Sequence, residues 1–222
     1  MVDAVLPIAH YKEGKSFFVW SGTKYARCQF HGQGEQIISG PYDTRSKWNS
    51  FQKAGWGAVD AVIPSPSEQN VFYVFHGAHY MRAAIYPEDD LRDATANGAV
   101  ATAAEWKGLV DAGFETVDAG CPDPIDNDNL FFFSGTKTLK YKMSQDKVIW
   151  GPMSIAEGWP SIKEAGFDTI DAIFTMHTDN KIFYVFCGDQ YATLKWDGTT
   201  WATLDSGPKL IKENWPSLKE WV

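Results

Sequence analysis

Histidine is the side chain of this sequence best suited to bind a metal, because a neutral imidazole can ligate haem iron or a transition metal. Two of the five histidines, His10 and His177, follow short apolar segments that begin with the same Asp-Ala pair. If these segments lie in neighbouring units of the fold, both imidazoles could reach one rim. A rim of polar side chains accounts for the same residues without a metal, so both interpretations stay open. The close pair His76 and His79 falls in a glycine-containing segment where a solvated turn is the simpler interpretation.

Two tryptophans and an aspartate frame a short polar segment near the C-terminus. Trp196, Asp197 and Trp201 would lie on the two sides of one hairpin. Aromatic faces stack on sugar rings, and an aromatic ring beside a carboxylate attracts an amine. The alternative is a pair of surface aromatics that pack across two strands. Trp56 lies outside the regular tryptophan pattern described below and is a further candidate for ligand contact.

The sequence lacks the spacings that identify common enzymes. His-Glu-x-x-His, Gly-x-Ser-x-Gly and the phosphate-binding Gly-x-x-x-x-Gly-Lys are all missing. Asp123, Asp126 and Asp128 are spaced like calcium ligands, but the glycine and the distal glutamate of an EF-hand loop are missing, which favours a polar hairpin turn. The sequence therefore predicts no catalytic residues, and a hydrolase is only a remote alternative.

Three landmarks recur four times in the same order, at intervals of about 55 residues, which indicates an internal repeat. Each unit opens with an Asp-Ala pair and continues through an aromatic run that ends in glycine. Each closes with a tryptophan followed by a segment of helical length. The aspartates of the pairs are Asp3, Asp60, Asp118 and Asp171. The closing tryptophans are Trp48, Trp106, Trp159 and Trp215.

Each unit is expected to form four short strands and then one short helix. The aromatic runs are rich in strand-forming residues and too short for a helix, and each glycine is expected in a tight hairpin. Gly40-Pro41, Gly151-Pro152 and Gly207-Pro208 are expected to end the fourth strand, because proline cannot donate into a ladder. Residues 155–165 are expected to be helical, with Pro160 near a turn or kink.

Four such units predict an all-β, four-bladed propeller, in which each blade is a four-stranded antiparallel sheet. The rival, a parallel βαβ sheet, would need long crossovers, whereas polar turns of a few residues join the strands here. Because the blades would bury one another's faces, we expect one domain over residues 1–222. The expected blades span approximately 1–57, 58–115, 116–168 and 169–222.

The overall composition narrows the range of partners. With 44% hydrophobic and 22% charged residues, the chain is typical of a folded globular protein. Its formal charge of −8 argues against binding nucleic-acid phosphates. No apolar run approaches the roughly 20 residues that span a bilayer. Three cysteines, Cys28, Cys121 and Cys187, do not make a disulfide framework. With no visible secretion signal, we expect a cytoplasmic or storage compartment, and secretion stays open.

The landmarks resemble the hemopexin-like repeat, whose units begin with Asp-Ala, pass through Phe-x-Gly-x-x-Tyr and close with Trp-Pro-x-Leu. Residues 187–191 and 215–218 are the best copies, and the resemblance covers essentially the whole chain. As a single propeller, the chain resembles the plant albumin-2 type or a microbial or fungal hemopexin-like lectin. Thr138 replaces the usual tyrosine, and no cysteine near either end could form the family's disulfide. Ring closure is therefore expected to depend on packing and strand pairing.

The resemblance implies ions on the propeller axis. In the family, the main-chain carbonyls of the Asp-Ala aspartates face a central channel and hold calcium or sodium, which here implies Asp3, Asp60, Asp118 and Asp171. A hard cation relieves the repulsion between converging carbonyl dipoles. A second ring, facing chloride or sodium, would be Val5, Val62, Gly120 and Ile173. The aspartate side chains could also cap or hydrogen-bond a neighbouring blade.

By resemblance, we expect a non-enzymatic protein that binds a small ligand, haem or a polyamine such as spermine, in a storage, stress or defence role. The charge of −8 favours the polyamine. The alternative is a carbohydrate-binding lectin with sites repeated around the ring, where several weak sites would add avidity. A homodimer is also open.

Overall fold

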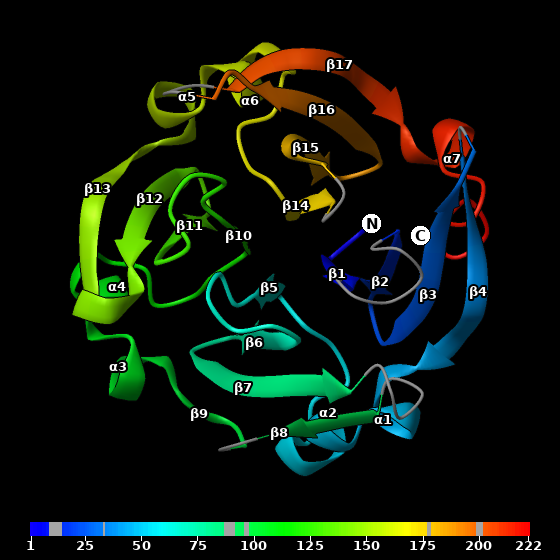
Figure 1. Ribbon diagram of the computed structural model, residues 1–222, viewed down its shortest axis with the longest axis horizontal. Helices are drawn as coiled ribbons and strands as arrows, with labels where there is room; N and C mark the ends of the chain where they lie inside the picture. The colour runs from blue at the N-terminus through cyan, green and yellow to red at the C-terminus, as the bar shows by residue number, and fades with distance from the viewer. Residues whose placement is uncertain (9–14, 33, 87–91, 96–97, 177–178, 199–201) are drawn as a thin grey trace.

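The computed structural model describes residues 1–8, 15–32, 34–86, 92–95, 98–176, 179–198 and 202–222. In these residues four antiparallel sheets surround a central axis, and each sheet is built from strands that follow one another in the chain (Figure 1). The predicted all-β, four-bladed propeller is therefore confirmed. His10, His177 and Trp201 lie outside the described residues.

In every blade the strands run in order from the axis to the rim. The first sheet contains β1 (Ala4–Ile8), β2 (Ser16–Ser21), β3 (Lys24–His31) and β4 (Gly34–Asp43). The second contains β5 (Ala61–Pro64), β6 (Val71–His76), β7 (His79–Tyr86), β8 (Arg92–Thr95) and the short β9 (Val100–Ala101), which also pairs with β7. The third contains β10 (Ala119–Pro122), β11 (Asn129–Ser134), β12 (Lys137–Lys142) and β13 (Lys147–Ser154). The fourth contains β14 (Ala172–Met176), β15 (Asp179–Cys187), β16 (Gln190–Trp196) and β17 (Ala202–Leu210).

A two-residue hairpin follows the second strand of each blade, as the sequence predicts. In the third blade, Ser134 pairs with Lys137 across this turn. Its glycine, Gly135, has a φ of +54°, in the left-handed region that glycine adopts at no steric cost. The aromatic strands β2, β6 and β11 are almost entirely buried, because both of their faces lie against neighbouring elements.

The Gly-Pro pairs lie inside the outermost strands, so the prediction that they end these strands is wrong. β4, β13 and β17 run through Gly40-Pro41, Gly151-Pro152 and Gly207-Pro208 respectively. The pairing register shifts nearby, between Thr138 and Lys140 in the third blade for example, so the strand bulges and then continues. One edge of an outermost strand has no strand partner in its sheet, and a proline there removes no ladder hydrogen bond.

Short helices follow the outer strands, and the single predicted helix is in fact split at the repeated tryptophan. The helices are α1 (Thr44–Lys47), α2 (Asn49–Ala54), α3 (Thr102–Glu105), α4 (Lys107–Asp111), α5 (Ile155–Gly158), α6 (Pro160–Glu164) and α7 (Ile211–Asn214), with a 3₁₀ turn, η3 (Met143–Gln145), in the third blade. Trp159 separates α5 from α6 with an extended φ of −135°, and Pro160 then begins α6. The four repeated tryptophans are buried, which explains why they recur.

The buried residues form four clusters, and each cluster joins two neighbouring blades. The first and second blades share a cluster around Trp20, Trp48 and Phe72. The second and third share one around Trp106 and Phe132. Corresponding clusters join the third blade to the fourth and the fourth to the first. Each blade therefore buries its apolar faces against its neighbours.

Packing, rather than strand pairing, closes the ring among the described residues. Each sheet contains only its own consecutive strands, so of the expected packing and strand pairing only packing joins the first and last blades in the described part of the chain. Trp215 of the last blade instead packs edge-on against Phe17 of the first, with ring centroids 6.1 Å apart. The Ser217 N–H also donates to Glu35 Oε1 at 2.8 Å. In the described part of the chain, no helix is long and apolar enough to cross a bilayer.

Candidate functional site

The four innermost strands meet on the propeller axis. β1 and β10 each contact β5 and β14, so the strands enclose a narrow channel. A cavity of about 10 Å³ lies between them, and Val5, Val62, Gly120 and Ile173 all line it. Three of the four repeated aspartates, Asp3, Asp118 and Asp171, also line this cavity. Its size is comparable to the roughly 10–15 Å³ that a single water molecule needs.

The aspartate side chains bind their own hairpins rather than a neighbouring blade, which corrects the expectation from the sequence. Each carboxylate accepts a hydrogen bond of 2.6 Å from the N–H of the hairpin glycine in the same blade. The pairs are Asp3–Gly22, Asp60–Gly77, Asp118–Gly135 and Asp171–Gly188. The aspartate N–H in turn donates to the carbonyl of the last aromatic residue in the second strand of the same blade. Asp118, for example, donates to the Phe133 carbonyl at 2.9 Å. The repeated aspartate thus fastens the inner strand to the hairpin.

The charges of the repeated aspartates influence one another's pKa. Burial raises the pKa of Asp3, and the charges of Asp171 and Asp60 add to the increase, although the Gly22 N–H opposes it. Burial likewise raises the pKa of Asp171, with a smaller contribution from Asp118. Among the described residues, no group of three or more His, Cys, Asp or Glu side chains could hold a metal. An axial ion would therefore depend on main-chain oxygens, as the resemblance implies.

A much larger cavity lies where the innermost strands end, and we call it the funnel. Its volume is about 470 Å³, and it includes Ile8, Pro64, Pro122 and Thr175 from the far ends of the four innermost strands. The β5–β6 connection contributes residues 65–70, and the β10–β11 connection contributes several more. The funnel therefore lies at the end of the innermost strands away from the Asp-Ala aspartates. Ligand pockets of other proteins commonly have volumes of 300–1,000 Å³.

The described lining of the funnel combines neutral polar groups with hydrocarbon. Seven residues carry an amide or hydroxyl side chain: Ser65, Ser67, Gln69, Asn70, Asn127, Thr175 and Asn180. Five are proline: Pro7, Pro64, Pro66, Pro122 and Pro124. Ile125 adds an isoleucine that is 59% exposed. Only Glu68 and Asp123 are charged among these lining residues.

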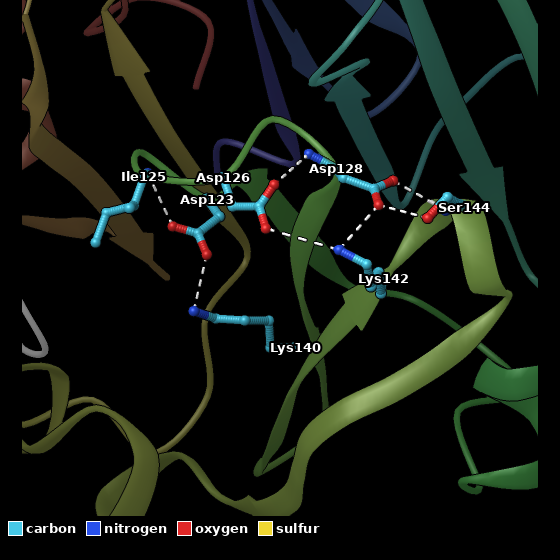
Figure 2. A network of polar contacts seen from close by, with 7 residues as sticks. All are labelled: Asp123, Ile125, Asp126, Asp128, Lys140, Lys142 and Ser144. Atoms are coloured by element: carbon cyan, nitrogen blue, oxygen red, sulfur yellow. Dashed lines mark hydrogen bonds and ion pairs between the residues drawn. The ribbon is translucent and has the colours of Figure 1, made fainter.

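Both funnel carboxylates are paired with a cation. Glu68 Oε1 accepts from Arg82 Nη2 at 2.6 Å. Asp123 Oδ2 lies 2.8 Å from Lys140 Nζ, and Asp123 Oδ1 accepts from the Ile125 N–H at 3.0 Å (Figure 2). The Asp123 side chain is only 2% exposed, so it offers almost no carboxylate surface to the funnel.

The aspartate-rich segment beside the funnel is a polar hairpin turn stabilised by lysine, not a set of free calcium ligands. Lys142 Nζ lies 3.0 Å from Asp128 Oδ2 and 3.7 Å from Asp126 Oδ2 (Figure 2). Ser144 also donates to Asp128 through its N–H and its hydroxyl. These contacts lower the pKa of Asp128, with the Ser144 hydroxyl as the largest cause. The three closely spaced carboxylates therefore stabilise a turn here.

The aromatic residues that the sequence singles out have different environments. Trp196 is only 6% exposed and its ring lies 6.2 Å from that of Phe183, so it offers little face for stacking on a sugar. Asp197 beside it is exposed. Trp56 is nearly buried and packs near His76, whose Nδ1 lies 3.4 Å from Asp60 Oδ1. Neither Trp196 nor Trp56 lines the funnel.

Sequence reasoning did not identify the funnel residues. The connection at residues 65–70 shows only a loop composition, Ser-Pro-Ser-Glu-Gln-Asn. One signal was available: proline recurs at or near the end of the first strand in three units, as Pro7, Pro64 and Pro122. A residue at a matching place in successive blades faces the same end of the ring, so these prolines could have indicated where the blades converge.

Comparison with known proteins supports the repeat-based assignment. Albumin-2 of Pisum sativum is 27% identical over 171 residues, which are 75% of this chain and 72% of that protein. Albumin-2 of Lathyrus sativus is 23% identical over 192 residues, covering 85% and 83% of the two chains. No family model matches the sequence.

Solved structures share the fold over almost the whole chain. A plant lectin with two metal binding sites from Cicer arietinum superposes with a TM-score of 0.87 at 20% identity, covering 100% of this chain and 98% of the other. A hemopexin fold protein, CP4 from cow pea, gives a TM-score of 0.87 at 19% identity, covering 99% and 97%. The chain is thus a homologue of the Albumin-2 seed proteins, with the four-bladed propeller fold of the hemopexin-like proteins.

Proposed function

We propose that this protein is a non-enzymatic propeller that holds one small organic molecule in the funnel. The observation that supports this is the cavity of about 470 Å³ at the end of the axis, with polar groups and hydrocarbon on its walls. Its Albumin-2 relatives are seed proteins, which agrees with a binding or storage role. Haem, a polyamine and a glycan are the ligand classes to test.

A titration that reports on the funnel itself tests this function. Haem, spermine and uncharged sugars are added separately to the ¹⁵N-labelled protein, and the side-chain amides of Asn127 and Asn180 are followed. Both side chains line the funnel and are exposed, so a ligand there should shift their resonances in a saturable way. If none of these ligands shifts either amide, the funnel is not the binding site and the proposal fails.

An ion on the propeller axis belongs to the same proposal. The axial cavity of about 10 Å³ suits a single calcium or sodium ion, and the aspartate side chains already bind the hairpin glycines. Main-chain oxygens would therefore supply the ligands, with chloride as a candidate for the second ring. Chelator-treated protein should melt at a lower temperature, and calcium or sodium should restore the melting temperature. An unchanged melting temperature with all ions would count against an axial site.

Carbohydrate binding is the second candidate. It is supported by the fold shared with the Cicer arietinum lectin, and by the hydroxyl and amide groups around the funnel. Agglutination that one sugar inhibits would favour a lectin, whereas saturable haem absorbance would favour the first group of ligands.

A further inference from the structure

The net charge of the chain and the charge of the funnel point to different ligands. The formal charge of −8 favours a cationic ligand such as a polyamine. Within the funnel, however, two of the twenty described lining residues are acidic, and both are paired with a basic side chain. Recognition in a pocket depends on the groups within contact distance more than on the total charge, because salt screens distant charges.

The two ion pairs act on the funnel carboxylates in different ways. Lys140 pairs with an Asp123 side chain that is only 2% exposed, so this carboxylate is shielded from a ligand. Arg82 neutralises the charge of Glu68, whose side chain is 48% exposed. Arg82 Nη2 holds Glu68 Oε1 at 2.6 Å, and this contact is the largest cause of a raised pKa at Arg82. Lys140 Nζ contacts both Asp123 and the Phe131 ring, whose centroid is 4.5 Å away. A polyamine would have to compete with both cations. Neither Arg82 nor Lys140 lines the funnel, so the cations lie behind its wall.

The remaining groups suit a neutral molecule with two different sides. Seven amide or hydroxyl side chains can exchange hydrogen bonds with hydroxyl groups. Five prolines, together with isoleucines such as Ile125, supply hydrocarbon contact without any charge. We propose that the funnel takes an uncharged ligand of mono- or disaccharide size, with hydroxyl or amide groups on one side and hydrocarbon on the other. This inference rests on the proposed function, since it specifies the ligand class of the same site.

The pairs Arg82–Glu68 and Lys140–Asp123 then determine specificity. Removing the cations should leave one or two funnel carboxylates without a partner cation and convert the funnel into a site for amines. An unpaired carboxylate could accept charge-assisted hydrogen bonds from the amines of spermine, so the affinity for spermine should rise by about tenfold or more.

The experiment compares spermine with uncharged sugars on matched variants. Maltose, lactose and N-acetylglucosamine are titrated one at a time into wild-type protein, with the Asn127 and Asn180 amides as reporters and calorimetry for affinity. At least one sugar should shift both amides saturably, and spermine should not. The double variant Arg82→Gln/Lys140→Gln should gain the spermine response. Lys163→Gln is the control, because Lys163 pairs with Asp168 outside the funnel and its loss changes the net charge by the same amount per site.

Arg82→Gln alone is also tested, because Glu68 is 48% exposed and its release should disturb the fold less than a change beside Asp123.

The outcomes of these titrations distinguish the neutral-ligand proposal from the proposed function. Spermine that shifts the funnel amides of wild-type protein overturns the neutral-ligand proposal and leaves the proposed function intact. The neutral-ligand proposal is also overturned if none of the three sugars shifts the amide resonances, or if Lys163→Gln gains as much affinity for spermine as the double variant. If neither the sugars, nor spermine, nor haem shifts the amide resonances, the proposed function is overturned as well.

Discussion

At the scale of single residues, the repeated aspartate is explained by the hairpin that it fastens. Asp171 accepts from the Gly188 N–H at 2.6 Å, 17 residues further along the chain. All four blades make the same contact, which explains why each repeat has an aspartate at this position. This explanation holds whether or not the main chain also binds an ion. Burial makes the charge of this carboxylate costly, which is why its pKa is raised.

The raised pKa of Asp171 predicts a specific dependence of stability on pH. Because the folded state binds this proton more tightly than the unfolded state, its contribution to stability is greatest below the unfolded pKa of 3.8 and decreases as pH rises through the raised folded pKa. Asp171→Asn removes this titration. The stability of wild-type protein relative to Asp171→Asn should therefore decrease as pH rises from about 3.5 to 6.

Urea unfolding at several pH values measures this difference. Asp189→Asn is the control, since Asp189 is exposed in the same hairpin and the substitution changes the same charge. A relative stability that rises with pH, or that follows the Asp189→Asn curve, would contradict the assignment.

At the scale of elements, the innermost strand of the third blade needs a residue without a side chain. A Cβ on Gly120 would lie 2.4 Å from Ile63 Cδ1 of the second blade and 2.8 Å from the Phe131 carbonyl oxygen. Ile63 could rotate, but the Phe131 carbonyl belongs to the strand paired with β10. The channel ring at Val5, Val62, Gly120 and Ile173 is therefore uneven because β10 approaches its neighbours so closely.

Gly120→Ala should destabilise the propeller, because an added methyl group in a closely packed interior forces its neighbours to shift. The expected loss is about 1–3 kcal/mol in the free energy of unfolding. Gly34→Ala is the matched control, since a Cβ there has nothing within 4 Å. Chemical denaturation measures both, and equal effects of the two substitutions would show that the close approach at Gly120 is not significant.

Local sequence patterns predicted some elements and failed for others. The hairpins after the aromatic strands follow directly from the glycines, because a left-handed turn depends on the residue itself. The helix expected over residues 155–165 is split, because Trp159 turns inward to the core and leaves helical geometry. The outer strands continue past Gly-Pro because the partner strand allows a bulge there. Both failures occur where contacts from other elements override local preference.

At the scale of the whole molecule, acidic side chains of the outer strands link neighbouring blades. Asp93 of the second blade accepts from the Asn49 and Ser50 N–H groups of the first, at 2.9 and 2.7 Å. Glu35 of the first blade accepts from Ser217 of the last at 2.8 Å. In both cases the carboxylate meets the backbone just after a repeated tryptophan. The Glu35 contact therefore repeats, across the ring closure, a link that also joins consecutive blades.

Glu35→Ala should loosen the ring closure, because it leaves the buried Ser217 N–H without its acceptor. The expected cost is about 1–3 kcal/mol of stability, with faster hydrogen exchange at the Ser217 amide. Glu220→Ala is the control, since the Glu220 side chain is 81% exposed. Exchange at Ser217 that stays as slow as in wild-type protein would show that packing around Trp215 closes the ring without Glu35.

The sequence by itself determined the number of blades and the hairpins, because each repeat carries its own aromatic strand, glycine turn and aspartate. The resemblance of its repeats also implied the residues of the axial channel, and Val5, Val62, Gly120 and Ile173 do line the axial cavity. Only the tertiary structure decided where the funnel lies and that its carboxylates are paired with cations. Glu68 and Arg82, or Asp123 and Lys140, become neighbours through strand pairing and loop conformation, which no local pattern encodes. For the same reason Trp196, which reads as a surface residue in the sequence, is buried once the third and fourth blades pack together.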